Sequence, residues 1–319
     1  MIQRERVRFL GNRLLQFVPV ILLATFIVFG LMQLVPGDIA VTLAGENASQ
    51  ARIAEIRGLY GLDRPMLVQY GDWLWNALHG DLSRSILSGA PVLDTIARTF
   101  PLTLLIVGYA MVLSLAIGLP LGVLAATRPG SRIDGFVTGL ASVGIAVPNF
   151  WLAMLLVSYF ALQLGWFPAT GAVAFGDDPW GALHAATLPA VALASGGIAD
   201  VARQLRSALI EVLSSQYVRT LRAKGLSDTA ILWKHGLKNV SVTMLTVTGL
   251  VFNRLLGATV VVEAVFAIPG IGSSVVYAAI HKDFPVIQGA VLVMVLVVIS
   301  VNLLIDLFYT ILDPRVARR

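Results

Sequence analysis

Six long stretches of the chain are almost free of charged residues. The first, residues 14–35, has no charge at all. The others lie between Arg98 and Arg128, from Asp134 to an aromatic end at 166–168, and at about 188–209, 240–262 and 286–311. About 20 mainly apolar residues cross the hydrocarbon core of a bilayer as a helix, and a charge at the centre costs a few kcal/mol. The runs therefore predict six transmembrane spans.

The spans are expected to be helices. Backbone groups in lipid must be hydrogen-bonded within their own segment, and the runs lack the period of two that barrel strands show. Only 13% of the residues are charged, against about 25% in soluble domains. We expect an all-α polytopic membrane protein. A net charge of +5, divided among several loops, argues against a nucleic-acid binder, and the lack of cysteine excludes thiolate metal sites.

Basic residues indicate the orientation, because they gather on the cytoplasmic side. With both termini cytoplasmic, 16 of the 23 Lys and Arg residues lie inside. The first run exceeds a signal-peptide core and no A-x-A site follows, so we expect it to stay uncleaved. The predicted segments are a cytoplasmic start (1–13), a first span (14–35), an extracytoplasmic loop (36–100), a five-helix core (101–311) and a cytoplasmic tail (312–319).

The outer loop, 36–100, is too long for a simple connection. Leu67, Tyr70, Leu74 and Leu78 recur at helical spacing, and Pro65 is placed for a first turn. Short helices are therefore expected there, forming a small cap on the outer face.

The inner loop, 210–239, predicts a rigid bend. Gly225 follows a helix-favouring run with basic residues at its end, as at a helix C-terminus. Ser227 is placed to cap a second helix with Asp228 in its first turn, and Leu226 and Ile231 occupy the hydrophobic staple positions around that cap. A solvated positive loop is the simpler interpretation, but an exposed apolar pair on a structured bend favours a docking surface for a cytoplasmic partner.

These residues resemble a known family, the permease subunits of bacterial ABC importers of the dipeptide/oligopeptide/nickel group. The inner loop reads YVRTLRAKG at 217–225; it keeps the glycine of the family's EAA-x3-G motif but has RTL in place of EAA. Further matches cover nearly the whole chain: PGD at 36–38, GLDRP at 61–65, QY at 69–70, GDL at 80–82, VEAVFAIPGIG at 262–272, DFPVIQ at 283–288 and DPR at 313–315.

The resemblance implies a type I importer permease of the bacterial inner membrane. Its partners would be a second homologous permease in a heterodimer, two P-loop ATPase subunits or domains, and an extracytoplasmic substrate-binding protein. The cargo would be peptides or similar small solutes, with nickel, sugars or another non-peptide solute as the alternative within the family. The resemblance also implies that one set of loop residues docks on the ATPase: Arg219, Arg222, Ala223, Lys224, Gly225, Leu226, Ser227 and Asp228.

The chain has no motif for chemistry of its own. The P-loop motif Gly-x4-Gly-Lys-Ser/Thr does not occur in the sequence, so ATP hydrolysis would need a separate chain. The four histidines are scattered, and we expect no catalytic residues, no metal site and no cofactor. An autonomous secondary transporter would show inverted repeats or proton-relay carboxylates, yet Asp200 and Asp306 are the two acids within the spans. A structural scaffold would not need a capped bend.

Arg254 interrupts the fifth span, and an ionisable residue at that depth is a functional candidate. Asp200 of the fourth span lies at a similar depth, so the two are expected to pair. The pair is either a buried contact that fixes helix packing, or Arg254 lines the pathway and meets a substrate carboxylate. A third option is that Arg254 faces the companion permease. Arg203 and Arg206 share a helix face with Asp200 and are expected to anchor the cytoplasmic side, with an i,i+3 pair on that face.

Overall fold

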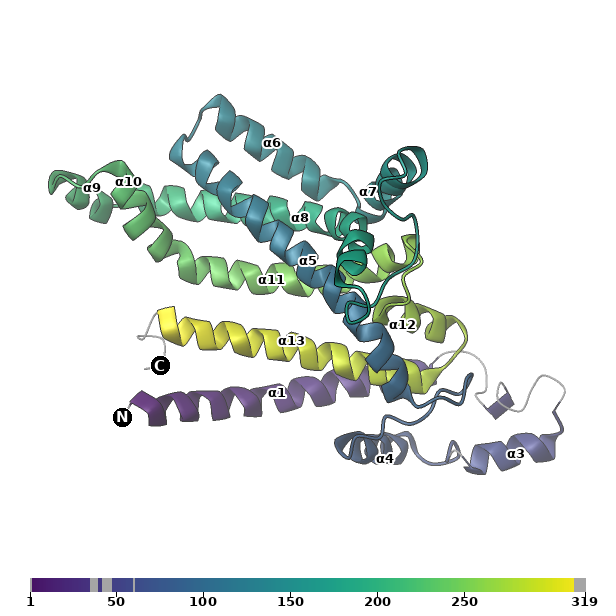
Figure 1. The fold of residues 1–319 in the computed structure, drawn as a ribbon. Helices are drawn as coiled ribbons and strands as arrows, with labels where there is room; N and C mark the ends of the chain where they lie inside the picture. Colours follow the sequence, from purple (N-terminus) through teal and green to yellow (C-terminus); the bar gives the residue numbers. More distant parts are fainter. Residues whose placement is uncertain (1, 35–39, 42–47, 60, 313–319) are drawn as a thin grey trace. The chain divides into compact units, whose positions relative to one another are not determined.

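The computed structural model describes residues 2–34, 40–41, 48–59 and 61–312, and these residues form helices without a β-strand. Figure 1 shows the elements along the chain. They are α1 (Ile2–Gln33), α3 (Gln50–Leu59), α4 (Met66–Leu78), α5 (Val92–Thr127), α6 (Arg132–Ala146), α7 (Asn149–Leu156), π-helix η1 (Val157–Gln163), α8 (Pro179–Ser214), α9 (Gln216–Ala223), α10 (Asp228–Ala230), π-helix η2 (Ile231–Gly236), α11 (Leu237–Val265), α12 (Ile271–Ile280) and α13 (Phe284–Leu312).

Five of these helices are long and apolar enough to cross a membrane. The third predicted span differs from a simple helix, because α6 and the α7–η1 segment meet at an angle of 96°. The break lies at Val147 and Pro148, which both have extended backbone conformations. A residue before proline is sterically kept out of the helical region, so the bend has a local cause. The described chain has six spans if this bent pair counts as one.

Several helices extend beyond the predicted boundaries. α5 begins at Val92, inside the segment 36–100 that was expected to be loop, and α8 continues to Ser214, inside the expected inner loop 210–239. Charge-free runs mark the hydrocarbon core, whereas a helix can continue past it into water. The DPR motif, the PGD motif and residues 313–319 of the predicted tail lie outside the described residues.

The chain divides into two compact units. Unit 1 comprises residues 1–100 and 273–300, and unit 2 comprises 101–272 and 301–319. In unit 2, α8 packs against α6, α7 and α11. Most of its buried residues are small or aliphatic, among them Ala190, Ala194 and Leu205. Small side chains allow close approach of helix backbones, which is how helices associate in lipid.

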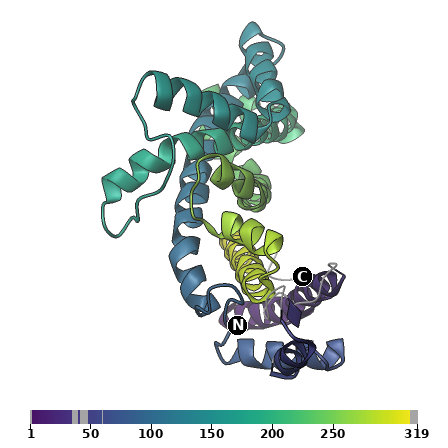
Figure 2. The same cartoon turned by 90° about the vertical axis from the view of Figure 1, so that its right-hand side faces the viewer.

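In unit 1, α4 lies beside α1, as Figure 1 and Figure 2 both show. Tyr70 of α4 forms the centre of this contact. Its ring meets Phe26 and Phe29 edge-on, and its hydroxyl lies 2.9 Å from the hydroxyl of Thr25. The two leucines at the ends of the expected apolar stripe, Leu67 and Leu78, are exposed.

Two glycines of α5 bring that helix close to α8 within unit 2. A Cβ atom at Gly122 would lie 2.9 Å from the carbonyl oxygen of Ala202 and from the Cβ of Leu205, and Gly118 is similarly tight against Ile198. We expect Gly122→Ala to lower stability by about 1–3 kcal/mol through overpacking. Gly139→Ala, where an added Cβ meets nothing within 4 Å, should leave stability unchanged or raise it. Thermal unfolding of the purified variants in detergent would measure both, and an equal loss in both would contradict the packing argument.

Candidate functional site

The bend, residues 215–236, joins α8 to α11 and is built by local backbone chemistry. Its first helix, α9, is capped by Ser215, whose hydroxyl accepts the amide of Val218. Gly225 follows the end of α9 with a φ of +81°, and its amide donates to the carbonyl of Arg222 at 2.9 Å. A positive φ is accessible to glycine at little cost, so this residue sets the direction in which the chain leaves α9.

The second half of the bend starts with a side-chain cap. The Ser227 hydroxyl accepts the amide of Ala230 at 3.3 Å, and Asp228 stands in the first turn of α10. Across the bend, the Arg222 Nε atom lies 3.1 Å from a carboxylate oxygen of Asp228. Because this ion pair is exposed, it contributes at most about 1 kcal/mol. The turn geometry, more than the ion pair, holds the two halves of the bend together.

The apolar surface of the bend differs from the expected one. Ile231 is 0% exposed, and Leu226 is half-buried, so the expectation of an exposed Leu226–Ile231 pair is wrong. Ile231 opens the π-helix η2, and this element packs back against α8. The exposed apolar side chains are instead aromatic: Trp233 is 63% exposed, and the hydroxyl of the half-exposed Tyr217 lies 2.9 Å from His235.

The structure brings Asp200 of α8 and Arg254 of α11 together. The Arg254 guanidinium contacts the Asp200 carboxylate, and its Nη2 atom donates to the carbonyl of Gly196 at 3.3 Å. Asp200 also accepts from Arg203, one turn further along α8, at 3.2 Å. The Asp200 side chain is 15% exposed, whereas that of Arg254 is 49% exposed. The pair is therefore buried on one side only.

Sequence reasoning missed the partner of Arg206. Its guanidinium binds the carboxylate of Asp134 through two nitrogens, one of them at 2.7 Å, and so ties α8 to the start of α6. Asp134 also accepts the amide of Gly130, and the hydroxyl of Ser131 accepts the amide of Asp134. The S-x-x-D spacing at 131–134 is a capping signal that is visible in the sequence.

The carboxylates of Glu263 and Asp283, from the motifs at 262–272 and 283–288, have structural roles. Glu263 is fully buried and accepts the hydroxyl of Thr103 at 2.6 Å, while the same hydroxyl accepts the amide of Ile271. In unit 1, buried Asp283 accepts the hydroxyl of Ser85 and the amide of Ile86. Buried carboxylates need such donors, so both residues fix the loops that surround them.

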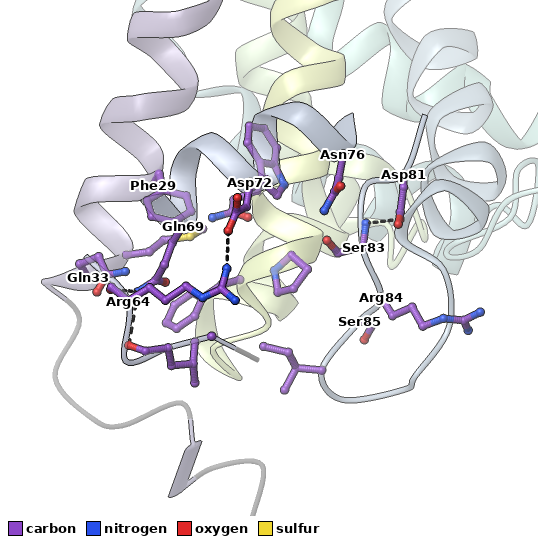
Figure 3. A pocket seen from close by; sticks show the side chains of 18 of the residues that line it. Phe29, Gln33, Arg64, Gln69, Asp72, Asn76, Asp81, Ser83, Arg84 and Ser85 are labelled. Atoms are coloured by element: carbon purple, nitrogen blue, oxygen red, sulfur yellow. Dashed lines mark hydrogen bonds and ion pairs between the residues drawn. The ribbon is translucent and has the colours of Figure 1, made fainter. Parts of the chain in front are cut away.

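A cavity of about 650 Å³ lies in unit 1. Its lining comes from the end of α1, from the end of α3 and the segment 61–64, from α4, from the 81–89 loop and from the start of α13. Figure 3 shows Arg64 facing Asp72, with 2.8 Å between their charged atoms, and Asp81 accepting the amide of Ser83. Arg64 and Asp72 form an ion pair, whereas Asp81 bonds to a backbone amide and Arg84 donates to the backbone carbonyl of Gly89. Within the described residues, no three His, Asp or Glu side chains gather as a metal site.

Comparison with known proteins gives matches along nearly the whole chain. A family described as "Binding-protein-dependent transport system inner membrane component" matches residues 118–318, and the corresponding N-terminal family matches residues 6–107. A putative peptide transport system permease protein of Brucella abortus is 43% identical, with 96% of this chain and 97% of the relative covered. The oligopeptide transport system permease protein AppB of Bacillus subtilis is 37% identical, with coverage of 96% and 98%.

The dipeptide transport system permease protein DppB of Escherichia coli is 34% identical, with 98% of this chain and 99% of the relative covered. Among solved structures, an inward-facing form of the MetNI methionine ABC transporter matches with a TM-score of 0.57. That match has 21% sequence identity and covers 69% of this chain and 97% of the other, which supports a shared fold.

Proposed function

The chain belongs to the family of inner-membrane components of binding-protein-dependent transport systems, and we propose on this basis that it carries peptides through half of a translocation pathway. It is a multi-pass inner-membrane permease subunit of an ABC importer, a transport subunit rather than an enzyme. The full-length similarity to relatives named as peptide, oligopeptide and dipeptide permeases is the observation that carries the peptide assignment. No described contact of this chain favours nickel or a sugar over a peptide.

The proposed assembly has a second, homologous permease, two P-loop ATPase subunits or domains and an extracytoplasmic binding protein. The 319-residue sequence has no P-loop, so we assign ATP hydrolysis to a separate chain. We place both termini and the bend in the cytoplasm, following the distribution of basic residues. The bend then presents exposed Trp233 and Tyr217, and the exposed basic residues Arg219 and Lys224, to the ATPase. Large aromatic side chains of this kind dominate the energy of protein interfaces.

The architecture of unit 2 supports a mechanical role for the bend. α8 runs directly into it on one side, and on the other side α11 follows η2, the last element of the bend, without an intervening loop. When the docked ATPase moves, the displacement reaches both helices, because neither connection contains a flexible linker. α8 is packed against α6, α7 and α11, so it passes that movement to the rest of unit 2.

Copurification and transport together test the proposal. The tagged chain, extracted in mild detergent, should retain a second permease and P-loop ATPases, and the reconstituted complex should take up tripeptide only with ATP and binding protein.

Trp233→Ala should weaken ATPase retention by at least about tenfold, as expected for a buried aromatic anchor. Trp180→Ala, which alters a still more exposed tryptophan (81%) at the start of α8, should have no effect. A chain that purifies alone and moves solute without ATP would identify a secondary transporter instead.

A further inference from the structure

A group of three charged residues in unit 2 has one more positive than negative charge. Asp200 accepts from both Arg203 and Arg254, and Arg206 is engaged elsewhere, by Asp134. One carboxylate therefore serves two guanidinium groups. The cluster keeps a net positive charge, and it joins two of the helices that are long and apolar enough to cross the membrane.

Arg254 lies near the middle of its helix. It is 17 residues after Leu237 and 11 before Val265, or roughly 25 Å and 16 Å from the two ends at 1.5 Å per residue. Almost half of its side chain is exposed at this depth. Exposure of a net positive charge to lipid tails is costly, so this side of Arg254 needs water, an anion or a group of the second permease.

The surface around Arg254 is open. Thr243, Leu250, Gly257 and Val261 share its face of α11 at helical spacing, and each is exposed. A Cβ atom at Gly257, one turn from Arg254, would meet nothing within 4 Å. Glycine inside a helix is unfavourable relative to alanine, and no close contact in this chain requires it here. The described part of the chain therefore leaves room for a ligand beside the guanidinium.

Two nitrogen donors of the Arg254 guanidinium are not used by the contacts described above. Its contact with Asp200 and its hydrogen bond to Gly196 both involve Nη2, which leaves Nη1 and Nε without a partner among the described residues. A planar guanidinium binds a carboxylate through two parallel hydrogen bonds, one from each of two nitrogens. Both of the paired arrangements that a guanidinium offers include Nη2, because the Nε–H bond points away from Nη1, so a second carboxylate would accept a single charged hydrogen bond from Nη1.

We propose that Arg254 binds the C-terminal carboxylate of the peptide in transit, with Asp200 as its counter-ion when the pathway is empty. This assignment rests on the proposed function and names one contact of the substrate. Asp200 lowers the cost of keeping Arg254 in the membrane, while its second partner, Arg203, leaves part of the guanidinium charge available. Peptides with a free carboxylate gain this contact, and peptides with an amide at the C-terminus do not.

The test compares a tripeptide with its C-terminal amide in the complete reconstituted importer. Uptake of both is measured for the wild type and for Arg254→Gln, with one preparation of binding protein. The quantity compared is the uptake of the acid divided by the uptake of the amide, for the wild type and for the variant. The binding protein has the same preference in both measurements, so that preference cancels in the comparison. We expect Arg254→Gln to lower the ratio about tenfold, as for loss of a charged hydrogen bond, with amide uptake and ATP hydrolysis nearly unchanged.

Two further variants separate recognition from structure. Arg132→Gln removes an exposed arginine at the start of α6, outside the cluster, and should keep the wild-type ratio. The exchange Asp200→Arg with Arg254→Asp restores an ion pair but moves the guanidinium to α8, so the ratio should stay low. An equal loss of acid and amide uptake in Arg254→Gln, or a wild-type ratio in the exchanged pair, would show that the pair is only structural. A wild type that moves neither peptide would refute the proposed function itself.

Discussion

Replacement of Gly225 by valine is expected to abolish ATP-driven uptake while the protein stays in the membrane. Gly225 has a φ of +81°, and a β-branched residue in that region is a rare, strained outlier. No atom lies within 4 Å of the position of an added Cβ, so the side chain itself meets no obstacle. The effect must come from the backbone, which would turn α9 away from its present direction relative to α10.

The measurement is paired uptake and ATP hydrolysis in proteoliposomes. In Gly225→Val, uptake should fall to the level of vesicles without ATP, and hydrolysis should continue without transport. Gly165→Val is the matched control, because Gly165 also has a positive φ (+65°) and open space at Cβ but lies between η1 and α8. Uptake by Gly225→Val at the wild-type level would remove the bend from the coupling mechanism.

Features fixed by neighbouring residues could be predicted from the sequence. The turn at Gly225 and the cap at Ser227 depend on residues at most five positions apart, and the structure has both. Pro148 was visible as well, but the prediction of an unbroken third span ignored its effect on Val147. Burial depends on distant helices. Ile231 is covered because η2 packs on α8, which the staple pattern around Ser227 does not reveal.

The same distinction applies to the charged residues. Asp200 and Arg254 could be matched because each depth can be counted along a helix of known direction, and the structure places them in contact. The partner of Arg206 could not be found by counting depth along a helix in this way. That partner, Asp134, is 72 positions away and stood at the edge of a predicted span. Glu263 was seen only as part of a motif, and its link to Thr103 spans 160 positions.

Loss of Arg206 is expected to be the most destabilising single change among the charged residues of unit 2. The Asp134 side chain is only 6% exposed, and Arg206 supplies two of its donors. Arg206→Met would leave a buried carboxylate with the amide of Gly130 and the hydroxyl of Thr138. Removal of one partner of a buried ion pair costs about 3–5 kcal/mol. Reversible unfolding of the purified subunit in mixed detergent micelles would measure the change in free energy of unfolding.

A double-mutant cycle shows whether the loss comes from the unpaired charge. Replacement of both partners, Arg206→Met with Asp134→Leu, should recover most of the stability, since an apolar pair of similar volume replaces buried charges well. Arg203→Met is the matched control: its pair with Asp200 is more exposed, and Asp200 would keep Arg254, so the loss should stay below about 1 kcal/mol. Equal losses in the single and double variants would mean that Arg206 acts through its aliphatic stem. If the double variant is stable yet transports poorly, the Asp134–Arg206 pair also links α6 to the movement of α8 that begins at the bend.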